Sequence, residues 1–537
     1  RVVKLELFRN GLSGYVPPEM GWLDGLTVLD LSGNGPAPNP DKADKGGMEG
    51  AASTNPGSSG GGLGGPIPPA LSRLSHLRTL DLNGNAHTRS IPPSLFSMMS
   101  LRVLNLANNM LNATLPSDIG IAASSSPPSS SDIGDASSSS SSSPPALRRL
   151  YLSNNRLTGT LPTALGYMEG LEQLHLNANR FVGPLPSQWG TSLGPSLRAL
   201  GLHGNNLGGT VPDAWRDLMQ LKDLYLDNNK LGGSVPSWMF DGTTMRMLED
   251  VRLHANELRG RLPEFGAMKN LELLYLHENG FTGPVPESLW SVESLVELQL
   301  YSNRLNGTIS DSLSNMNRLR VAYLDKNRFG GTLPPSMGIM ETLEYFRADG
   351  NRLGGTLPWT VGSFPSLRKL HLQSNRFRGT IPDLSGMTSL EVLFLDDNML
   401  EGPIPESVRD MKRLRKLHLA NNSIASEIPP AIGNLAAMED LSLQNNEMTG
   451  TVPIEIGSLA SLKILNLRNN TLTGMVPAEL QKLVSLRILR LDKNDLSGAV
   501  PEAVCSLTEQ GSLKEFVANC AETSVPELMC SCCTECA

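Results

Sequence analysis

One pattern of leucine, asparagine, glycine and proline recurs along almost the whole chain of 537 residues. Its consensus is L-x-x-L-x-L-x-x-N-x-L-x-G-x-(I/L/V)-P, and successive copies lie about 24 residues apart. The asparagine marks about 19 copies, at positions 10, 34, 85, 109, 155, 179, 205, 229, 256, 279, 303, 327, 351, 375, 398, 422, 446, 470 and 494. A period of this length is typical of stacked repeats rather than of several independent globular domains.

The first half of each copy predicts a short β-strand at its L-x-L segment, because alternate side chains of a strand point to opposite faces. The leucines then point into a core that stacked copies share, and the intervening residues point outward. The asparagine turns the chain out of the strand, and its amide can bond backbone groups that the turn leaves unpaired. The sequence therefore predicts an α/β repeat solenoid with parallel strands on its concave face.

The second half of each copy indicates which type of repeat the chain contains. The segments LTGTLP (157–162), FTGPVP (281–286), FRGTIP (377–382) and LTGMVP (472–477) resemble the plant-type extracellular leucine-rich repeat family. That resemblance covers nearly the whole chain and implies a second strand row near the Gly-x-(I/V/L)-Pro segment. Members include ectodomains of receptor-like kinases and receptor-like proteins, and secreted polygalacturonase inhibitors. The family's paired-cysteine N-terminal cap is missing, which indicates a chain trimmed at its start.

We expect a leucine-rich repeat solenoid over residues 1–502, interrupted by two inserts near 35–62 and 117–146. Both inserts lack periodic apolar residues and are expected to be disordered loops. Residues 503–537 are predicted to form a cysteine-rich cap, because the open end of a solenoid exposes core leucines. This ending resembles the caps of algal leucine-rich repeat proteins.

The cap contains all the cysteines of the chain, which are Cys505, Cys520, Cys530, Cys532, Cys533 and Cys536. Six cysteines allow 15 pairings, and the sequence does not choose among them. The cluster from Cys530 to Cys536 can alternatively be read as a zinc site. Its spacing is not that of a standard zinc finger, and an extracellular family favours disulfides.

Composition and motifs exclude several classes of function. The net charge is −8 and no basic block is present, so nucleic acid is not an expected partner. No apolar run approaches the length of a membrane span, so no membrane segment is expected within this chain. No nucleophile, base and orienting group form a recognised motif, so we expect no enzyme activity and no cofactor. Asp227, His254 and His277 share one column on successive strands, but Arg252 nearby opposes a cation, and no metal site is predicted.

Charged residues alternate at one position of the repeat, directly after its first leucine. Seven successive copies carry Arg320, Glu344, Arg368, Glu391, Arg415, Glu439 and Lys463. Adjacent strands lie about 4.8 Å apart, so these side chains are predicted to form a ladder of ion pairs across the sheet. An exposed pair contributes at most about 1 kcal/mol, so the ladder is expected to favour stacking register rather than to bind a ligand.

Most of the chain's 8 tyrosines and 8 histidines occupy the outward positions of the strands. These positions hold Tyr151, His175, His203, Tyr225, Arg252, His254, Tyr275, His277, Tyr301, Tyr323, Arg347, His371, Phe394 and His418. Rigid amphipathic rings suit recognition because they bury much area and lose little rotamer freedom. The alternative is that the rings stack on one another and only stiffen the sheet.

The candidate ligand-binding site is the centre of this face, predicted as an extended groove. It comprises Tyr225, Arg252, Tyr275, His277, Tyr301, Tyr323 and Arg347. The arginines would offer forks for a carboxylate or sulfate, and the rings would stack on sugar or peptide faces. His277 would make binding sensitive to pH, because an unperturbed histidine has a pKa of about 6.5.

The resemblance implies an extracellular recognition module, most simply a receptor-like ectodomain that binds a peptide, glycan or protein and engages a co-receptor. Two other readings stay open, a secreted inhibitor of wall-degrading enzymes and a structural matrix or adhesion protein. A downstream membrane helix would favour the receptor. For a secreted or cell-surface chain, the sequons at Asn112, Asn306, Asn421 and Asn469 predict N-glycosylation.

Overall fold

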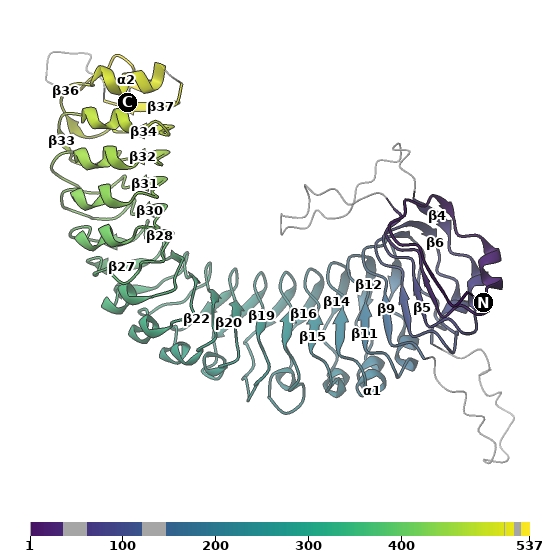
Figure 1. The fold of residues 1–537 in the computed structure, drawn as a ribbon. Coiled ribbons are helices and arrows are strands. Elements are labelled where there is room, and N and C mark those ends of the chain that lie inside the picture. Colours follow the sequence, from purple (N-terminus) through teal and green to yellow (C-terminus); the bar gives the residue numbers. More distant parts are fainter. Residues whose placement is uncertain (1, 36–61, 121–145, 510, 520–527, 537) are drawn as a thin grey trace, which may run out of the picture. The chain divides into compact units, whose positions relative to one another are not determined.

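The computed structural model describes residues 2–35, 62–120, 146–509, 511–519 and 528–536. The two predicted inserts lie largely outside the described residues, as does Cys520. The chain divides into two compact units, Arg1–Gly280 (unit 1) and Phe281–Ala537 (unit 2). Both are stacks of the predicted repeat, and each is described by itself (Figure 1).

The main strand row of unit 1 takes one short strand from each repeat, with parallel pairing between successive strands. Its strands are β1 (Lys4–Glu6), β3 (Val28–Asp30), β5 (Thr79–Asp81), β7 (Val103–Asn105), β9 (Arg149–Tyr151), β11 (Gln173–His175), β13 (Ala199–Gly201), β15 (Asp223–Tyr225), β17 (Asp250–Arg252) and β19 (Leu273–Tyr275). Central leucines such as Leu150, Leu174 and Leu200 pair in register on successive strands and are fully buried. The predicted fold is therefore confirmed in this unit.

The main strand row of unit 2 follows the same rule. Its strands are β21 (Glu297–Gln299), β23 (Val321–Tyr323), β24 (Tyr345–Arg347), β26 (Lys369–His371), β28 (Val392–Phe394), β30 (Lys416–His418), β31 (Asp440–Ser442), β32 (Ile464–Asn466), β34 (Ile488–Arg490), β37 (Glu515–Ala518) and β39 (Glu535–Cys536). We call the outward side of the main row in either unit its strand face.

A second set of short parallel strands lies at the Gly-x-(I/V/L)-Pro segments, as the resemblance implied. In unit 1 these are β2 (Gly14–Tyr15), β4 (Leu63–Pro66), β6 (Ala86–Arg89), β8 (Met110–Leu111), β10 (Thr158–Thr160), β12 (Arg180–Pro184), β14 (Asn206–Gly209), β16 (Lys230–Gly233) and β18 (Glu257–Gly260). The others are β20 (Gly280–Pro284), β22 (Arg304–Asn306), β25 (Gly354–Thr356), β27 (Arg376–Gly379), β29 (Met399–Leu400), β33 (Thr473–Gly474), β35 (Asp495–Leu496), β36 (Gly498–Ala499) and β38 (Leu528–Met529).

Short helices close most repeats. Many of them follow the proline of the repeat, whose fixed φ favours the start of a helical turn, as at Pro162 (φ −69°) before η5. In unit 1 they are η1 (Pro18–Trp22), η3 (Pro69–Arg73), η4 (Pro93–Leu95), η5 (Thr163–Tyr167), α1 (Gln188–Leu193), η6 (Asp213–Asp217) and η7 (Ser237–Met239). In unit 2 they are η8 (Leu289–Ser291), η9 (Asp311–Asn315), η10 (Pro335–Ile339), η11 (Trp359–Ser363), η12 (Glu406–Asp410), η13 (Pro430–Asn434), η14 (Ile454–Ser458), η15 (Ala478–Lys482) and α2 (Glu502–Glu509). No described helix is long and apolar enough to cross a bilayer.

The repeating asparagines fasten each copy to the next. Asn179 Nδ2 donates to the Leu152 carbonyl of the preceding repeat (2.9 Å) and to the Leu176 carbonyl of its own repeat (3.0 Å). Asn179 Oδ1 accepts from the Leu157 amide (3.0 Å). The amide therefore satisfies buried backbone groups of two repeats, which explains why the pattern tolerates no apolar residue there.

The cap contains the helix α2, the final strands β37 and β39, and disulfides in the C-terminal region, as predicted. Cys505 pairs with Cys532, and Cys530 pairs with Cys533. Cys536 is also disulfide-bonded. Phe516 of β37 is fully buried, and it pairs in register with Leu489 of β34.

The predicted charge ladder is confirmed in unit 2. Ion pairs join Arg320 to Glu344 (2.7 Å) and Arg368 to Glu391 (2.6 Å), and Glu439 lies between Arg415 and Lys463 and pairs with both. These carboxylates and most of their partners are partly exposed, so each pair stabilises the unit only weakly.

Candidate functional site

The strand face of unit 1 holds a fixed cluster around Arg252. Tyr225, Arg252 and Tyr275 occupy equivalent positions of β15, β17 and β19. The guanidinium carbon of Arg252 lies 4.9 Å from the Tyr225 ring centroid and 5.1 Å from the Tyr275 ring centroid. The cation is therefore held between two electron-rich rings, which is favourable for each contact. We call these three residues the aromatic row of unit 1.

Asp250 binds this cluster from the same strand. Its Oδ2 accepts from Arg252 Nη2 (2.8 Å) and from the Tyr225 hydroxyl (3.1 Å). Burial, together with the carboxylates of Asp250 and Asp223, raises the pKa of Tyr225, so this phenol stays protonated. The guanidinium of Arg252 already has an internal carboxylate partner. Its Nε and Nη2 donate to that carboxylate, so part of the fork predicted for a ligand carboxylate or sulfate is already occupied.

His277 is buried, with 6% of its surface exposed, and not directed into solvent as predicted. Its ring stacks on that of His254, with centroids 4.1 Å apart and planes inclined by 18°. Burial, and secondarily the neighbouring His254, lowers the pKa of His277 to about 3. Its imidazole is therefore neutral at physiological pH, so we expect no pH-sensitive contact through His277 near neutral pH.

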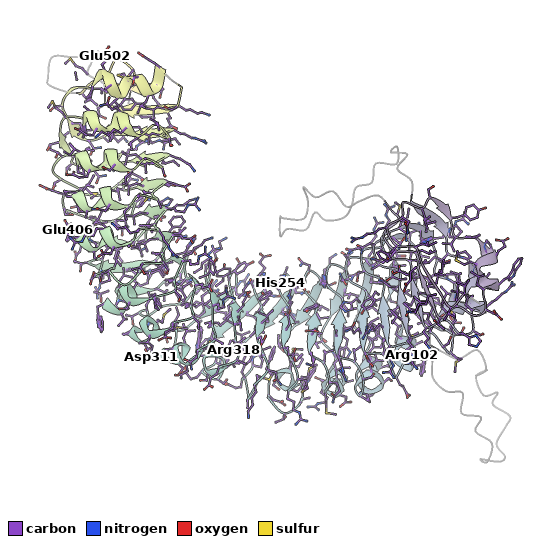
Figure 2. All side chains as sticks on the ribbon, in the orientation of Figure 1. Arg102, His254, Asp311, Arg318, Glu406 and Glu502 are labelled. Atoms are coloured by element: carbon purple, nitrogen blue, oxygen red, sulfur yellow. A yellow bond between two sulfur atoms is a disulfide. The ribbon has the colours of Figure 1, made fainter. Side chains whose placement is uncertain are left out.

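The side chains of Asp227 and His254, which is labelled in Figure 2, meet at 3.5 Å between Oδ2 and Nε2. Burial lowers the pKa of His254, and the Asp227 carboxylate acts in the opposite direction. Because the two histidine rings stack face to face, their nitrogens do not converge on one point. Among the described residues, no group of three or more His, Cys, Asp or Glu side chains has the geometry of a metal site.

Earlier in unit 1, the rings are interrupted at Gly201 of β13. Tyr151 and His175 form a tilted pair with centroids 5.4 Å apart. A Cβ atom at Gly201 would lie 2.8 Å from His175 Nδ1, so the imidazole occupies the space that a side chain would need. Tyr225, on the other side of Gly201, instead meets His203 edge to face at 6.0 Å.

The strand face of unit 2 contains the other predicted site residues, Tyr301, Tyr323 and Arg347. Tyr301 and Tyr323 form an edge-to-face pair with centroids 6.4 Å apart. The guanidinium carbon of Arg347 lies 5.5 Å from the Tyr323 centroid. Arg347 also donates to Asp325 Oδ2 (3.3 Å) and to Asp349 Oδ1 (3.4 Å), so this arginine too has internal carboxylate partners. Burial raises the pKa of Asp325 to about 6, against the opposing effect of Arg347.

Sequence reasoning placed His371, Phe394 and His418 on the strand face but left them out of the candidate site. They continue the register of Tyr323 and Arg347 through β26, β28 and β30. The Phe394 ring lies 4.7 Å from His371 and 4.2 Å from His418, measured between centroids. Their shared position in the L-x-L segment is the sequence signal that could have included them in the candidate site. We call Tyr323, Arg347, His371, Phe394 and His418 the aromatic row of unit 2.

In both units, half-buried rings on adjacent strands are fixed by stacking, by cation–π contacts and by carboxylates. An arrangement of this kind offers rigid apolar surface and hydroxyl groups, which suit non-covalent recognition.

Comparison with known proteins identifies relatives of the chain. A model described as leucine-rich repeat region matches residues 376–536, and a leucine-rich repeat model matches 76–98, 100–121, 146–168, 220–241, 270–292 and 294–316. No curated protein sequence matches significantly.

Several solved structures share the fold. The plant peptide hormone receptor RGFR1 in complex with RGF2 is 25% identical, with a TM-score of 0.77 over 99% of this chain and 83% of that chain. The Arabidopsis receptor kinase HAESA, in complex with the peptide hormone IDA and the co-receptor SERK1, is 26% identical, with a TM-score of 0.76 over 98% of this chain and 84% of that chain. A leucine-rich repeat protein of Leptospira interrogans is 26% identical, with a TM-score of 0.53 over 83% of this chain and 92% of that chain.

Proposed function

The chain belongs to the leucine-rich repeat family, with repeats of the plant extracellular type, and from this premise we propose that it is an extracellular module that binds a peptide on its strand face. The proposal rests on one observation, the gathering of half-buried rings into a fixed aromatic row in each unit. The similarity to RGFR1 and HAESA, both described in complex with peptides, supports a peptide over a glycan. A co-receptor chain is proposed on the same basis, from the HAESA complex.

The charges around the rings of unit 1 favour a ligand with basic side chains, because Asp223 and Asp250 flank the aromatic row of this unit. Beside the row of unit 2, Asp325, Asp349 and Asp396 are accompanied by the cations of Lys369 and Lys416. Arg252 and Arg347 are already paired with some of these carboxylates, so they add little positive potential outside the protein. Peptide residues with lysine, arginine or hydroxyl groups would complement such a surface.

The first test is a substitution series on the strand face. A ligand is selected from a library of random peptides displayed on phage, and its affinity is measured for Tyr275→Ala, Phe394→Ala and the matched control Met399→Ala. We expect about thirtyfold weaker binding when a ring that contacts the ligand is removed, because an anchoring aromatic contributes about 2 kcal/mol. Met399 lies on β29 in the second strand row with 52% exposure, and its substitution should leave affinity unchanged. Folded variants of both rings that keep full affinity would refute the proposal.

An extracellular chain should also carry N-linked glycans. The side chains of Asn112, Asn306, Asn421 and Asn469 are all exposed, as acceptors must be. After expression through a eukaryotic secretory pathway, treatment with an N-glycosidase should lower the intact mass. Each Asn→Gln substitution at an occupied sequon should remove one step of that decrease. An unchanged mass of the secreted protein would contradict this prediction.

A further inference from the structure

The charge ladder has a different composition in the first half of unit 1. The position after the first leucine carries Arg78, Arg102, Arg148, Glu172 and Arg198 on successive strands. Backbone hydrogen bonds connect these residues directly, from Arg102 N to Arg78 O (2.8 Å), from Arg148 N to Arg102 O (2.8 Å) and from Arg198 N to Glu172 O (2.8 Å). Their side chains therefore leave adjacent strands about 4.8 Å apart, along the edge where the strands begin.

Three of these arginines, Arg78, Arg102 and Arg198, are not neutralised within the described part of the chain. Arg148 Nη1 lies 2.5 Å from Glu172 Oε1, so this pair continues the ladder. Arg102 and Arg198 are exposed and form no ion pair with any described residue. Arg252 and Arg347 on the strand face differ from them, because their guanidinium groups form ion pairs with internal carboxylates.

An open cavity of about 410 Å³ is lined by Arg102, Arg148, Glu172 and Arg198. Its other walls include Ala146, Gly170 and Ser196, which each stand directly before the first leucine of their repeat. Because these residues are small, the long arginine side chains border a recess instead of packing on bulky neighbours. We call this cavity the basic recess of unit 1; Arg102 at its wall is labelled in Figure 2.

Unit 2 contains a second recess of the same construction. A cavity of about 370 Å³ is lined by Lys463, Arg487 and Lys514, with the small residues Ser485 and Ser512. The cations again follow one another along the ladder, from Arg487 N to Lys463 O (2.8 Å) and from Lys514 N to Arg487 O (2.9 Å). Lys463 pairs with Glu439, whereas Arg487 and Lys514 have no ion pair among the described residues. Both recesses therefore occur where the alternation of charges stops.

We propose that the two basic recesses bind an acidic polysaccharide, a linear chain carrying sulfate or carboxylate groups. An exposed, unpaired guanidinium matches both groups, because its planar fork donates two parallel hydrogen bonds to either. Cations repeated along the strands suit a ligand whose anionic groups are also repeated. The chain as a whole has a net charge of −8, so the recesses are local exceptions to the charge of the protein.

The lining of the recesses argues against the other common polyanions. Neither recess is lined by an aromatic side chain, and a single-stranded nucleic acid gains much of its affinity by stacking bases on rings. Large apolar anchors are also few there, which disfavours a protein partner that needs a hot spot. None of the residues that line the recesses belongs to the aromatic row of either unit, so an extracellular polysaccharide could hold the protein in place without covering those rings.

The test uses the whole chain and defined oligosaccharides in isothermal titration calorimetry at 50 mM and 200 mM salt. The probes are a heparin hexasaccharide, which carries sulfates and carboxylates, an oligogalacturonate hexamer, which carries carboxylates alone, and neutral maltohexaose. We expect binding of at least one acidic probe, weakening at the higher salt concentration, and none of maltohexaose. Binding of both acidic probes assigns carboxylate recognition, and binding of the heparin probe alone assigns sulfate recognition.

The variants locate the binding. Arg102→Gln/Arg198→Gln and Arg487→Gln/Lys514→Gln should each weaken binding at their recess by about tenfold or more, because charge-assisted hydrogen bonds are lost. The matched control Arg156→Gln/Arg180→Gln removes two exposed arginines of unit 1 outside the recess, with the same change in net charge. Three results would overturn the proposal: no acidic probe binds at 50 mM salt, the control loses as much affinity as the recess variants, or polyglutamate and single-stranded DNA bind as tightly with the same dependence on the recess arginines.

Discussion

An Asn446→Ala variant should lose about 4 kcal/mol of unfolding free energy. Asn446 Nδ2 donates to the carbonyls of Leu419 (2.9 Å) and Leu443 (3.0 Å), and its Oδ1 accepts from the Ile424 amide (3.1 Å). The side chain is buried, so alanine leaves these backbone groups without partners and without access to bulk water. Each unsatisfied buried group costs about 1–3 kcal/mol, and the substitution leaves three such backbone groups unsatisfied at once.

The effect should be measurable by chemical denaturation at pH 7.5 and, more locally, by hydrogen exchange. A loss of about 4 kcal/mol should raise the exchange rate of the neighbouring core amides by roughly a thousandfold, if they exchange by opening of this repeat. The matched control is Asn434→Ala, because Asn434 is exposed and donates a single hydrogen bond, to the Ala431 carbonyl at 3.3 Å. It should lose no more than about 0.5 kcal/mol. Equal losses in the two variants would show that the buried amide does not connect the repeats.

The same asparagine explains why the fold was predictable from the sequence. A side chain that must satisfy backbone groups of two successive repeats can be replaced in few ways, so it recurs visibly at a fixed period. The leucines recur for a related reason, because each one fills a core shared with its neighbours. Strand register followed directly, since equivalent positions of successive copies pair with one another, as Leu224 does with Val251.

The candidate site was predicted less well, because the environment of an outward side chain depends on its neighbours across the sheet. The period correctly placed Tyr225, Arg252 and Tyr275 side by side. It did not reveal that Arg252 is bound by Asp250, although residues two apart on one strand share a face and the pairing was readable from the sequence. The burial of His277 was not readable in this way. It accompanies the stacking of its imidazole on that of His254, which the spacing of residues does not specify.

The cations of the basic recesses were also recognisable in the sequence, because they occupy the repeat position that forms the charge ladder. The alternation of charges from Arg320 to Lys463 predicted a ladder of ion pairs across the sheet, and the observed ion pairs confirm it. Arg102 and Arg198 occupy the same position in earlier repeats, and neither has an ion-pair partner among the residues that the structure describes. What the sequence does not give is the recess itself, because its volume depends on how the small residues before the leucines pack.

The buried histidines should make the protein less stable below neutral pH. The pKa of His277 is about 3 in the folded protein, against about 6.5 in an unfolded chain. Because the folded value is depressed, the unfolded state takes up the proton first. The contribution of His277 is therefore present in full above pH 6.5 and is lost as the pH falls toward 3. At pH 5 the loss should be about 2 kcal/mol.

His371 in unit 2 should behave in the same direction, since burial and Arg347 lower its pKa to about 4. Asp325 has the opposite effect on the pH dependence of stability in this unit. With a folded pKa of about 6, above the value of about 3.9 for an unfolded aspartate, its protonation stabilises the folded state by about 1.4 kcal/mol at pH 5. The net effect in unit 2 is therefore smaller than His371 alone would give, and single variants are needed to separate the contributions.

The decisive variant is His277→Phe, which keeps a ring against His254 and removes the titratable group. Its unfolding free energy relative to the parent protein should rise by about 2 kcal/mol when the pH is lowered from 8 to 5, whatever its value at pH 8. The control Met399→Ala removes an exposed side chain that does not titrate, and its difference from the parent should stay constant between the two pH values. If the His277→Phe difference were also constant, the imidazole of His277 would accept a proton as readily in the folded protein as in the unfolded chain. That result would contradict its burial as a neutral ring and would restore His277 as a candidate pH-sensitive contact on the strand face.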